Sequence, residues 1–170
     1  VPGITNENSV VVGIPRLDMH IQNTRTSKPN KNIVLFFFEP DLKSKFLFSD
    51  KKTSHQYIER GEKFQIDIIN FCTRNKDYKL LIKAKNLVSL NKLRNVITKY
   101  QINLTSNVKI TSKGNSLDYI RNSSFVAGFV STTLLEAMIL NKPILSPYLG
   151  DIVTSTDVDY FTQYPKSINY

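Results

Sequence analysis

The hydrophobic residues of this 170-residue chain gather in short continuous runs separated by polar or amphipathic stretches. Apolar runs without polar interruption are typical of strands that are buried on both faces of a parallel sheet. The pattern predicts five such strands, over Ile33–Phe38, Lys79–Lys83, Val108–Thr111, Phe125–Phe129 and Pro143–Ser146. A shorter β-rich run, Ser9–Val12, precedes them.

Between these runs, apolar residues recur at helical spacing. Phe64, Ile68, Phe71 and Cys72 follow one face of a helix that opens at Gly61, so Cys72 is expected to be a core residue and not a nucleophile. Three further helices are expected, over Leu87–Tyr100, Ser116–Arg121 and Ser131–Leu140. The repeated alternation of strand and helix predicts an α/β fold, a doubly wound Rossmann-like parallel sheet with helices on both faces.

The polar segments suggest how the chain is organised. Residues 22–32 are typical of a loop, and residues 39–60 form a long polar stretch without a clear pattern, which is usually functional or mobile. We expect a hinge segment over 1–18, one domain over 19–150 and a C-terminal tail over 151–170. The start Val1-Pro2-Gly3 lacks Met, and we expect the chain to be part of a longer protein.

Composition excludes several classes of protein. A hydrophobic fraction of 41% excludes global disorder, and a single Cys excludes a disulfide framework and a cysteine zinc cluster. Two His residues leave little material for a histidine metal site. The longest apolar runs, about six residues, are far shorter than the roughly 20 that span a bilayer.

Charge is concentrated in one part of the sequence. Lys and Arg exceed Asp and Glu by 23 to 14, and residues 76–113 hold nine of the basic residues against Asp77 alone. Such a region indicates an anionic partner, such as a phosphorylated substrate or an anionic membrane surface, or else a solvated lysine-rich face. No RNA-recognition or helix-turn-helix signature is present, so we expect no nucleic-acid partner.

The segment from Phe125 to Pro147, FVAGFVSTTLLEAMILNKPILSP, holds the candidate chemistry. A helix that begins at the carboxyl edge of a parallel sheet offers free N–H groups and a partial positive charge to a phosphate. Ser131, Thr132 and Thr133 add hydroxyls there, and Glu136, one turn on, is suited to a ribose diol. Thr133 and Glu136 also have the spacing of a capping box, which is the favoured interpretation from spacing alone.

STTLLEAMILNKPIL resembles the phosphate- and ribose-binding segment in the C-terminal domain of GT-B nucleotide-sugar glycosyltransferases, in particular those of bacterial surface carbohydrate and lipopolysaccharide assembly, a superfamily that includes UDP-GlcNAc 2-epimerase-like proteins. The resemblance implies that Glu136 holds the ribose. It also implies that the turn from Gly128 through Ser131, Thr132 and Thr133 meets the diphosphate.

Three shorter segments fit the same resemblance. VVGIPRLD, residues 11–18, is similar to the segment by which such chains enter the C-terminal domain, and it contains Arg16. KLLIKAKN, residues 79–86, is similar to the strand that ends in a basic residue followed by Pro-His-Pro. Lys83 keeps the basic residue, whereas Ala84 and Lys85 replace Pro and His. Lys113 and Gly114 follow the third strand, where GT-B domains often meet the base; Asn115 beside them is also a good helix N-cap.

The resemblance implies a donor-binding domain for a nucleotide-diphosphate sugar, without a cofactor or an obligatory metal. Arg16, Lys83 and Lys113 are then candidates for contact with the phosphates, through electrostatic catalysis. The acceptor would bind an N-terminal domain that is not present here, so we expect this chain to bind nucleotide weakly and to catalyse nothing alone. Such enzymes imply a cytoplasmic location, peripheral to the inner membrane. The alternatives are a UDP-sugar 2-epimerase, a glycerophosphotransferase, and a non-enzymatic module that binds anions or nucleic acid.

Other motifs are absent or weak. The sequence has neither a P-loop nor a G-x-G-x-x-G fingerprint. His20 and His55 have no placed catalytic partner. Asp157 and Asp159 have the D-x-D form of a metal site, but this spacing arises easily by chance and we expect no metal there. Glu39 follows the first strand at its carboxyl end and is expected to begin a loop rather than to contact a ligand.

Overall fold

A computed structural model of the chain describes residues 31–39, 51–129, 131–148 and 167–169. Within these residues six strands form one sheet in which every neighbouring pair is parallel. The strands are β1 (Asn32–Phe36), β2 (Lys79–Lys83), β3 (Val108–Thr111), β4 (Phe125–Gly128), β5 (Ile144–Ser146) and β6 (Ser167–Asn169). Their order across the sheet is β3-β2-β1-β4-β5-β6. The predicted α/β, Rossmann-like fold is therefore confirmed.

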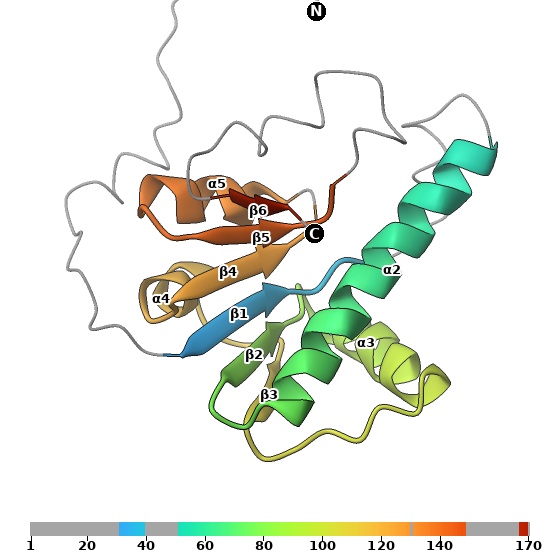
Figure 1. Ribbon diagram of the computed structural model, residues 1–170, viewed down its shortest axis with the longest axis horizontal. Coiled ribbons are helices and arrows are strands. Elements are labelled where there is room, and N and C mark those ends of the chain that lie inside the picture. Colours follow the sequence, from blue (N-terminus) through green and yellow to red (C-terminus); the bar gives the residue numbers. More distant parts are fainter. Residues whose placement is uncertain (1–30, 40–50, 130, 149–166, 170) are drawn as a thin grey trace, which may run out of the picture.

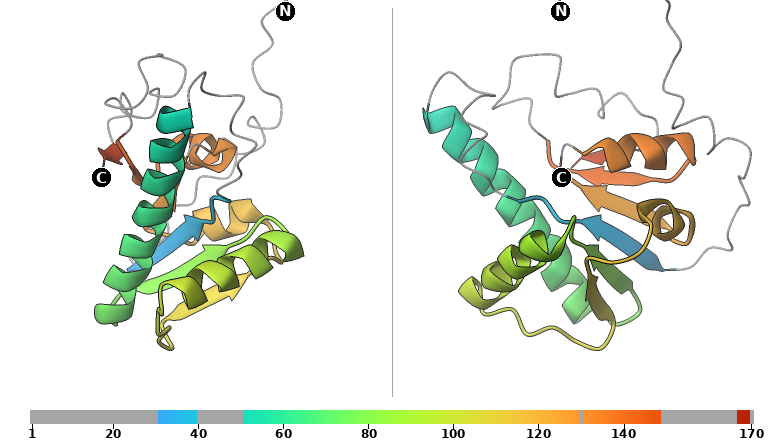
Figure 2. Two further views of the ribbon diagram at one scale, coloured as in Figure 1. Left: turned by 90° about the vertical axis from the view of Figure 1, so that its right-hand side faces the viewer. Right: turned by 180° about the vertical axis from the view of Figure 1, so that it is seen from behind.

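Helices cover both sides of this sheet. They are α2 (Lys51–Arg74), α3 (Leu87–Lys99), α4 (Ser116–Arg121) and α5 (Thr132–Ile139). The long helix α2 lies in front of the sheet in Figure 1, and α4 and α5 lie behind it, as the view from the back in Figure 2 shows. Helix α3 packs with α2, because residues of both contribute to the same hydrophobic cluster.

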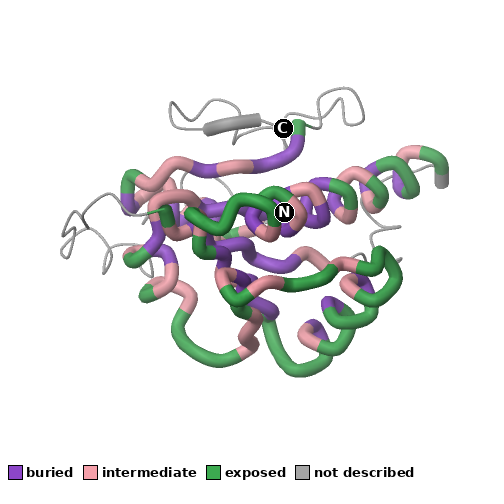
Figure 3. The backbone as a smooth tube through the Cα atoms, turned by 60° about the horizontal axis from the view of Figure 1, so that its bottom comes forward, coloured by how far each residue is buried: buried purple, intermediate pink, exposed green. Residues whose placement is uncertain are grey.

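Alternation along the strands divides the interior into two cores. In β1 and the residue after it, Ile33, Leu35 and Phe37 pack toward α2 and α3, whereas Val34 and Phe36 pack toward α4 and α5. We name these the α2-side core and the α5-side core. Figure 3 shows the buried strand residues between exposed helix and loop surfaces. Continuous burial of β1 explains why its sequence carries no polar alternation.

Most predicted elements are confirmed to within one or two residues, but the prediction for residues 39–60 is wrong in part. Residues 51–60 are the first ten residues of α2, which begins at Lys51 and not at Gly61. This half of the helix is polar on most of its surface and buries mainly Ser54 and Tyr57, so its apolar pattern is too sparse to reveal a helix.

Cys72 and Phe71 were both expected on the buried face of α2, and only Cys72 is buried. Cys72 is fully buried, as predicted, and burial raises the pKa of its thiol to about 11. Phe71, by contrast, is 46% exposed, although its spacing places it near the same face. It lies at the border of that face and packs against the ring of Tyr78, 5.2 Å away between centroids.

Several expectations concern residues outside the described ranges. They include the hinge segment, the Ser9–Val12 strand, Arg16, His20 and the Asp157/Asp159 pair. Strand β6 lies within the segment expected to be a tail, and it extends the sheet beyond β5. The sequence analysis did not predict this strand.

The strand order reverses at one point of the sheet. From β1 the chain continues to β2 and β3 on one side, and it then returns to β4 on the other side of β1. In open α/β sheets ligands commonly bind at such a reversal, at the carboxyl ends of the two central strands. Here that position lies between the ends of β1 and β4, directly before α5, and we refer to it as the crevice.

Candidate functional site

The turn between β4 and α5 is built around Ser131. Its backbone is extended (φ −132°, ψ 140°), and its hydroxyl oxygen accepts a hydrogen bond from the Thr133 N–H at 3.3 Å. The Ser131 and Thr133 hydroxyl oxygens are also 2.7 Å apart. Ser131 is therefore the N-cap, and the capping box favoured from the spacing of Thr133 and Glu136 is wrong. Thr133 lies inside the helix, so it cannot act as the flanking residue of that motif.

Glu136 is the fifth residue of α5 and is 3% exposed. A carboxylate in this position is on the inner side of the helix, one turn beyond the cap. Thr132, at the first helical position, is exposed. The hydroxyls of the turn and the carboxylate thus come from one short helix, and they lie at different depths.

Gly128 permits the close approach of β4 and α5. A Cβ atom at this position would lie 3.2 Å from Leu134 Cδ2, closer than ordinary van der Waals contact. The absence of a side chain lets the start of the helix sit directly over the end of the strand. This supports the expected position of Gly128 in the turn, for a steric reason.

Lys83 lies in the same row of the sheet as Gly128. Lys83 is in register with Phe36 across β2 and β1, and Phe36 is in register with Gly128 across β1 and β4. Two strand spacings place the Lys83 and Gly128 backbones about 10 Å apart. Because residues in register project to the same side, Lys83 shares the α5 side of the sheet with Phe36.

The Lys83 ammonium is held by main-chain oxygens. Its Nζ donates to the carbonyls of Ala84 at 2.8 Å and Ser112 at 3.0 Å, and the residue is 7% exposed. Within the described residues no carboxylate forms an ion pair with it. Burial without a counter-charge lowers the pKa of Lys83 below its ordinary value of 10.5.

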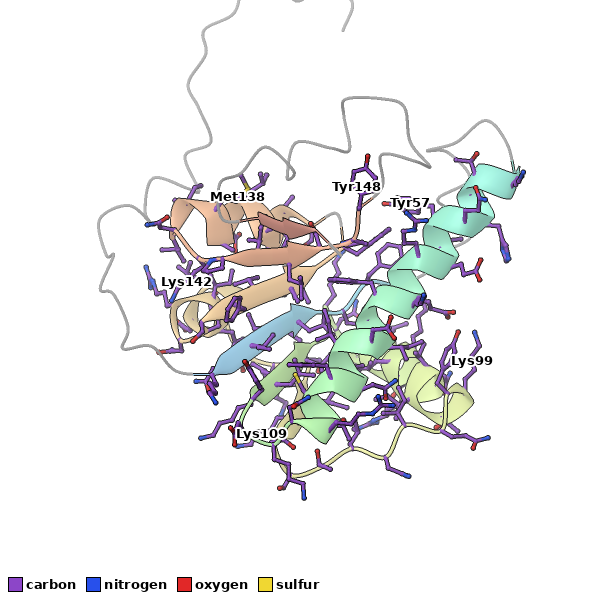
Figure 4. All side chains as sticks on the ribbon, in the orientation of Figure 1. Tyr57, Lys99, Lys109, Met138, Lys142 and Tyr148 are labelled. Carbon is purple, nitrogen blue, oxygen red and sulfur yellow. The ribbon has the colours of Figure 1, made fainter. Side chains whose placement is uncertain are left out.

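Aromatic rings fill the α2 side of the crevice. The Phe129 ring lies 4.4 Å from Phe38 and 4.6 Å from Tyr57, between centroids. Gly61 makes room for this cluster, since a Cβ there would lie 2.9 Å from the Phe38 ring. Tyr57 is labelled in Figure 4 on the part of α2 near the end of β5. A ligand at this crevice therefore has little space on the α2 side.

Two polar side chains hold the segment after β1 in place. The buried Gln65 accepts from the Phe38 N–H at 2.7 Å and donates to the Phe38 carbonyl at 3.1 Å. Glu39 forms an ion pair with Lys92 at 2.6 Å and accepts a hydrogen bond from the Ser89 hydroxyl. Glu39 therefore joins the segment after β1 to α3. Neither Gln65 nor Ser89 was expected from the sequence, because both lie within helical patterns that give no sign of a distant partner.

The Lys113-Gly114-Asn115 turn lies apart from the crevice. It follows β3, which is two strands away from β1. Asn115 is the N-cap of α4, as expected, and accepts from the Leu117 N–H at 3.0 Å. Gly114 has φ +84° and lies against Tyr119, whose hydroxyl donates to the Lys113 carbonyl at 3.1 Å. Local folding accounts for Gly114, and Lys113 is exposed at the far edge.

The basic residues of segment 76–113 do not form one patch. Lys79 and Lys83 begin and end the same strand and so lie at opposite edges of the sheet. Figure 4 likewise shows Lys99 and Lys109 far apart. Lys99 is also paired with Glu62 at 3.1 Å. The concentration of charge in the sequence is thus dispersed by the fold.

Lys142 has a structural role that the sequence did not reveal. Its Nζ donates to the carbonyls of Arg121 at 2.8 Å and Ser123 at 2.7 Å, so it closes the carboxyl end of α4. Burial lowers its pKa from 10.5. The side chain lies at the amino edge of the sheet, away from the crevice (Figure 4).

The described part of the chain has neither a cluster of metal ligands nor a membrane-spanning helix. No group of three or more His, Cys, Asp or Glu side chains there is arranged to hold a metal ion. Among the four described helices, none combines the length and the apolar character that crossing a bilayer requires.

Comparisons with known proteins give only distant structural likenesses. No family model matches the chain, and no curated protein matches it significantly. Among solved structures it is similar to Thermosulfurimonas dismutans KpsC, a beta Kdo 2,4 transferase, with a TM-score of 0.43 and 12% identity over 79% of this chain. The chain spans 45% of the length of that protein. At this identity the similarity describes the path of the chain and not its chemistry.

Proposed function

We propose that this chain is the donor-binding domain of a GT-B-like glycosyltransferase for surface polysaccharide or lipopolysaccharide synthesis. The donor, a nucleotide-diphosphate sugar, would bind in the crevice between β1 and β4, on the α5 side. The observation that carries the proposal is the position of Lys83, a buried cation that has no carboxylate partner among the described residues, in the same strand row as Gly128, which leads into α5.

Electrostatics favour a phosphorylated ligand at this position. A buried ammonium that contacts only neutral carbonyls is unfavourable until an anion compensates its charge. The N-terminus of α5 adds a partial positive charge, next to the hydroxyls of Ser131 and Thr132. A diphosphate between the two would be stabilised from both sides.

The proposal also assigns a position to the ribose of the donor. Glu136 lies one turn along α5, where its carboxylate can accept two hydrogen bonds from a ribose diol. The aromatic cluster of Phe38, Tyr57 and Phe129 occupies the α2 side, so the proposal assigns the donor to the α5 side.

The proposed mechanism is electrostatic. When the bond from the anomeric carbon to the diphosphate breaks, negative charge develops on the departing nucleotide diphosphate. Lys83 and the α5 N-terminus would stabilise that charge, and no metal is required. The acceptor and its activating base would belong to a second domain, so the 170-residue chain is expected to bind nucleotide without transferring sugar. We expect the complete enzyme to work in the cytoplasm, peripheral to the inner membrane.

The test is calorimetric titration of UDP, GDP, CDP and CMP into the chain, repeated with Glu136→Ala and Glu136→Gln. We expect one nucleotide to bind selectively and both variants to lose about tenfold in affinity, the magnitude of one hydrogen bond to a charged group. Glu59→Ala, which removes an exposed carboxylate from α2, serves as the matched control. Preference for CDP over UDP would indicate the glycerophosphotransferase alternative.

Two results would contradict the proposal. One is the absence of nucleotide binding by a chain whose fold is confirmed by circular dichroism. The other is binding that weakens steeply with salt and is the same for all nucleotides and for Glu136→Gln, which would indicate non-specific anion binding.

A further inference from the structure

A cavity of about 320 Å³ lies on the α2 side of the sheet, away from the crevice. Its floor is formed by the strands, one wall by α2 and one end by the turn before β2. The lining residues are Ile33, Asp67, Ile68, Phe71, Tyr78, Phe125 and Leu145. Ile33 and Phe125 stand near the starts of β1 and β4, so the cavity opens toward the amino edge. It therefore belongs to a different part of the molecule from the proposed donor site.

The lining fits an apolar occupant. Ligand pockets measure roughly 300–1,000 Å³, and this cavity is at the lower end of that range. Its polar groups are the Asp67 carboxylate and the Tyr78 hydroxyl. A sugar or nucleotide would lose most of its hydrogen bonds to water here without replacing them, at a cost of about 1–3 kcal/mol for each group. A hydrocarbon chain would incur no such cost.

The surrounding sheet surface is apolar and, among the described residues, no helix covers β4 and β5 on this side. Phe125 and Leu145 are partly buried there, whereas Val126 and Ile144, which face α5, are completely buried. Parallel sheets normally bury both faces. The partial exposure of Phe71, at 46%, adds to this apolar surface.

The open end of the cavity is positively charged. Tyr78, which lines it, has the Lys31 ammonium 5.5 Å above its ring. Arg74 ends α2, one turn after Phe71, and Lys76 lies in the turn that follows; both are exposed. Of these cations, Lys31 is paired with Asp77 at 3.0 Å. The excess of positive charge at this end favours an anionic headgroup, which would remain in solvent beside these side chains.

We propose that this cavity binds a single-chain anionic amphiphile, with its hydrocarbon chain against Ile68, Phe71 and Leu145 and its headgroup beside Arg74 and Lys76. This site is independent of the proposed donor site and does not rest on the proposed function.

The experiment uses dodecanoate as the probe, below its micellar concentration, titrated into the 170-residue chain by calorimetry. Binding is expected to weaken about tenfold when the chain is shortened to decanoate, because two buried methylenes contribute about 1.6 kcal/mol. Dodecyltrimethylammonium, with the same chain and a cationic head, is expected to bind about fivefold more weakly than dodecanoate. In Arg74→Gln/Lys76→Gln this preference should disappear.

The decisive variant is Phe71→Glu, which places a charge in the cavity wall at a partly exposed position and so is expected to leave the fold intact. It should reduce dodecanoate affinity at least tenfold. Leu87→Glu is the matched control, since Leu87 is an exposed apolar residue at the start of α3, and it should leave affinity unchanged. Methyl NMR spectra of the unmodified chain locate the ligand directly, through shifts of Ile33, Ile68 and Leu145.

Three outcomes would overturn the proposal. They are no binding of dodecanoate at submillimolar concentration, equal binding by Phe71→Glu and the unmodified chain, and methyl shifts centred on the α5-side residues Ile120 and Leu134 instead of the cavity. The methyl shifts decide the question even if a variant proves unstable.

Discussion

The two sides of the β1–β4 crevice are built from the same two strands and have opposite character. On the α2 side, Phe38, Tyr57 and Phe129 pack ring against ring and are fixed by Gln65. On the α5 side, the strand ends in Gly128, and hydroxyl groups follow. One side is thus closed by large apolar groups, and the other has small and polar ones.

Under the proposed function, this difference separates stability from binding at one sheet edge. Aromatic packing anchors α2 to the ends of β1 and β4. The proposal assigns binding to the α5 side, through the helix N-terminus, the hydroxyls and the Lys83 ammonium. Variants on the two sides should therefore have separable effects, and three predictions test this.

The largest effect is expected from Tyr57→Ala on the α2 side. Tyr57 is 3% exposed and contacts both other rings, so its removal leaves a cavity. The free energy of unfolding should fall by about 3 kcal/mol, measured by urea denaturation. Nucleotide affinity, measured under conditions where the variant is folded, should change less than threefold. Tyr100→Ala, at an exposed position, is the control; an equally large loss there would contradict the assignment.

The second prediction concerns Lys83→Met on the α5 side. Met preserves the buried hydrocarbon stem and removes the charge, so the fold should persist. Nucleotide diphosphate affinity should fall about 10- to 100-fold, as expected for a hydrogen bond to a charged group. Lys85→Met, two residues along and exposed, should leave affinity within twofold. If the two variants weakened binding equally, the overall positive charge of the chain, and not Lys83 in particular, would account for the affinity.

The third and smallest effect is a pH dependence on the α2 side. Burial holds the pKa of the folded Cys72 thiol at about 11, against an ordinary value of 9.0. Between these values the unfolded chain loses this proton first, so the contribution of Cys72 to stability decreases as the pH rises from 9 to 11. Between pH 8 and 10 the loss should be about 1 kcal/mol. Denaturation curves of Cys72→Ala should lack this component, whereas an identical pH slope in both proteins would show that the thiol is not buried.

Much of the fold follows from hydrophobic pattern alone. The strands β1 to β5 appear as apolar runs, and Cys72 is recognised by helical spacing. The first half of α2 could not be predicted from the hydrophobic pattern, because its buried residues are too few to create a helical period. Strand β6 was missed because three residues, Ser167–Asn169, carry no pattern; their position depends on pairing with β5.

The residues of the candidate site could be predicted from the sequence better than their positions relative to one another. The turn after β4 is visible as hydroxyl residues before an apolar helix, but which residue caps the helix depends on backbone angles. Ser131 adopts the extended conformation that the spacing assigned to Thr133. Lys83 and Lys142 are both lysines at strand or helix ends, and only the fold shows that the Lys83 ammonium bonds the Ala84 and Ser112 carbonyls whereas Lys142 closes α4.

The position of β3 has a consequence for solubility. Among the described residues this four-residue strand is the last of the sheet on the side opposite β6, and an uncovered edge can recruit strands from other molecules. Lys109, exposed within β3 (Figure 4), places a charge on that edge. A short edge strand that carries a lysine pairs poorly with copies of itself, so this residue protects the chain against aggregation.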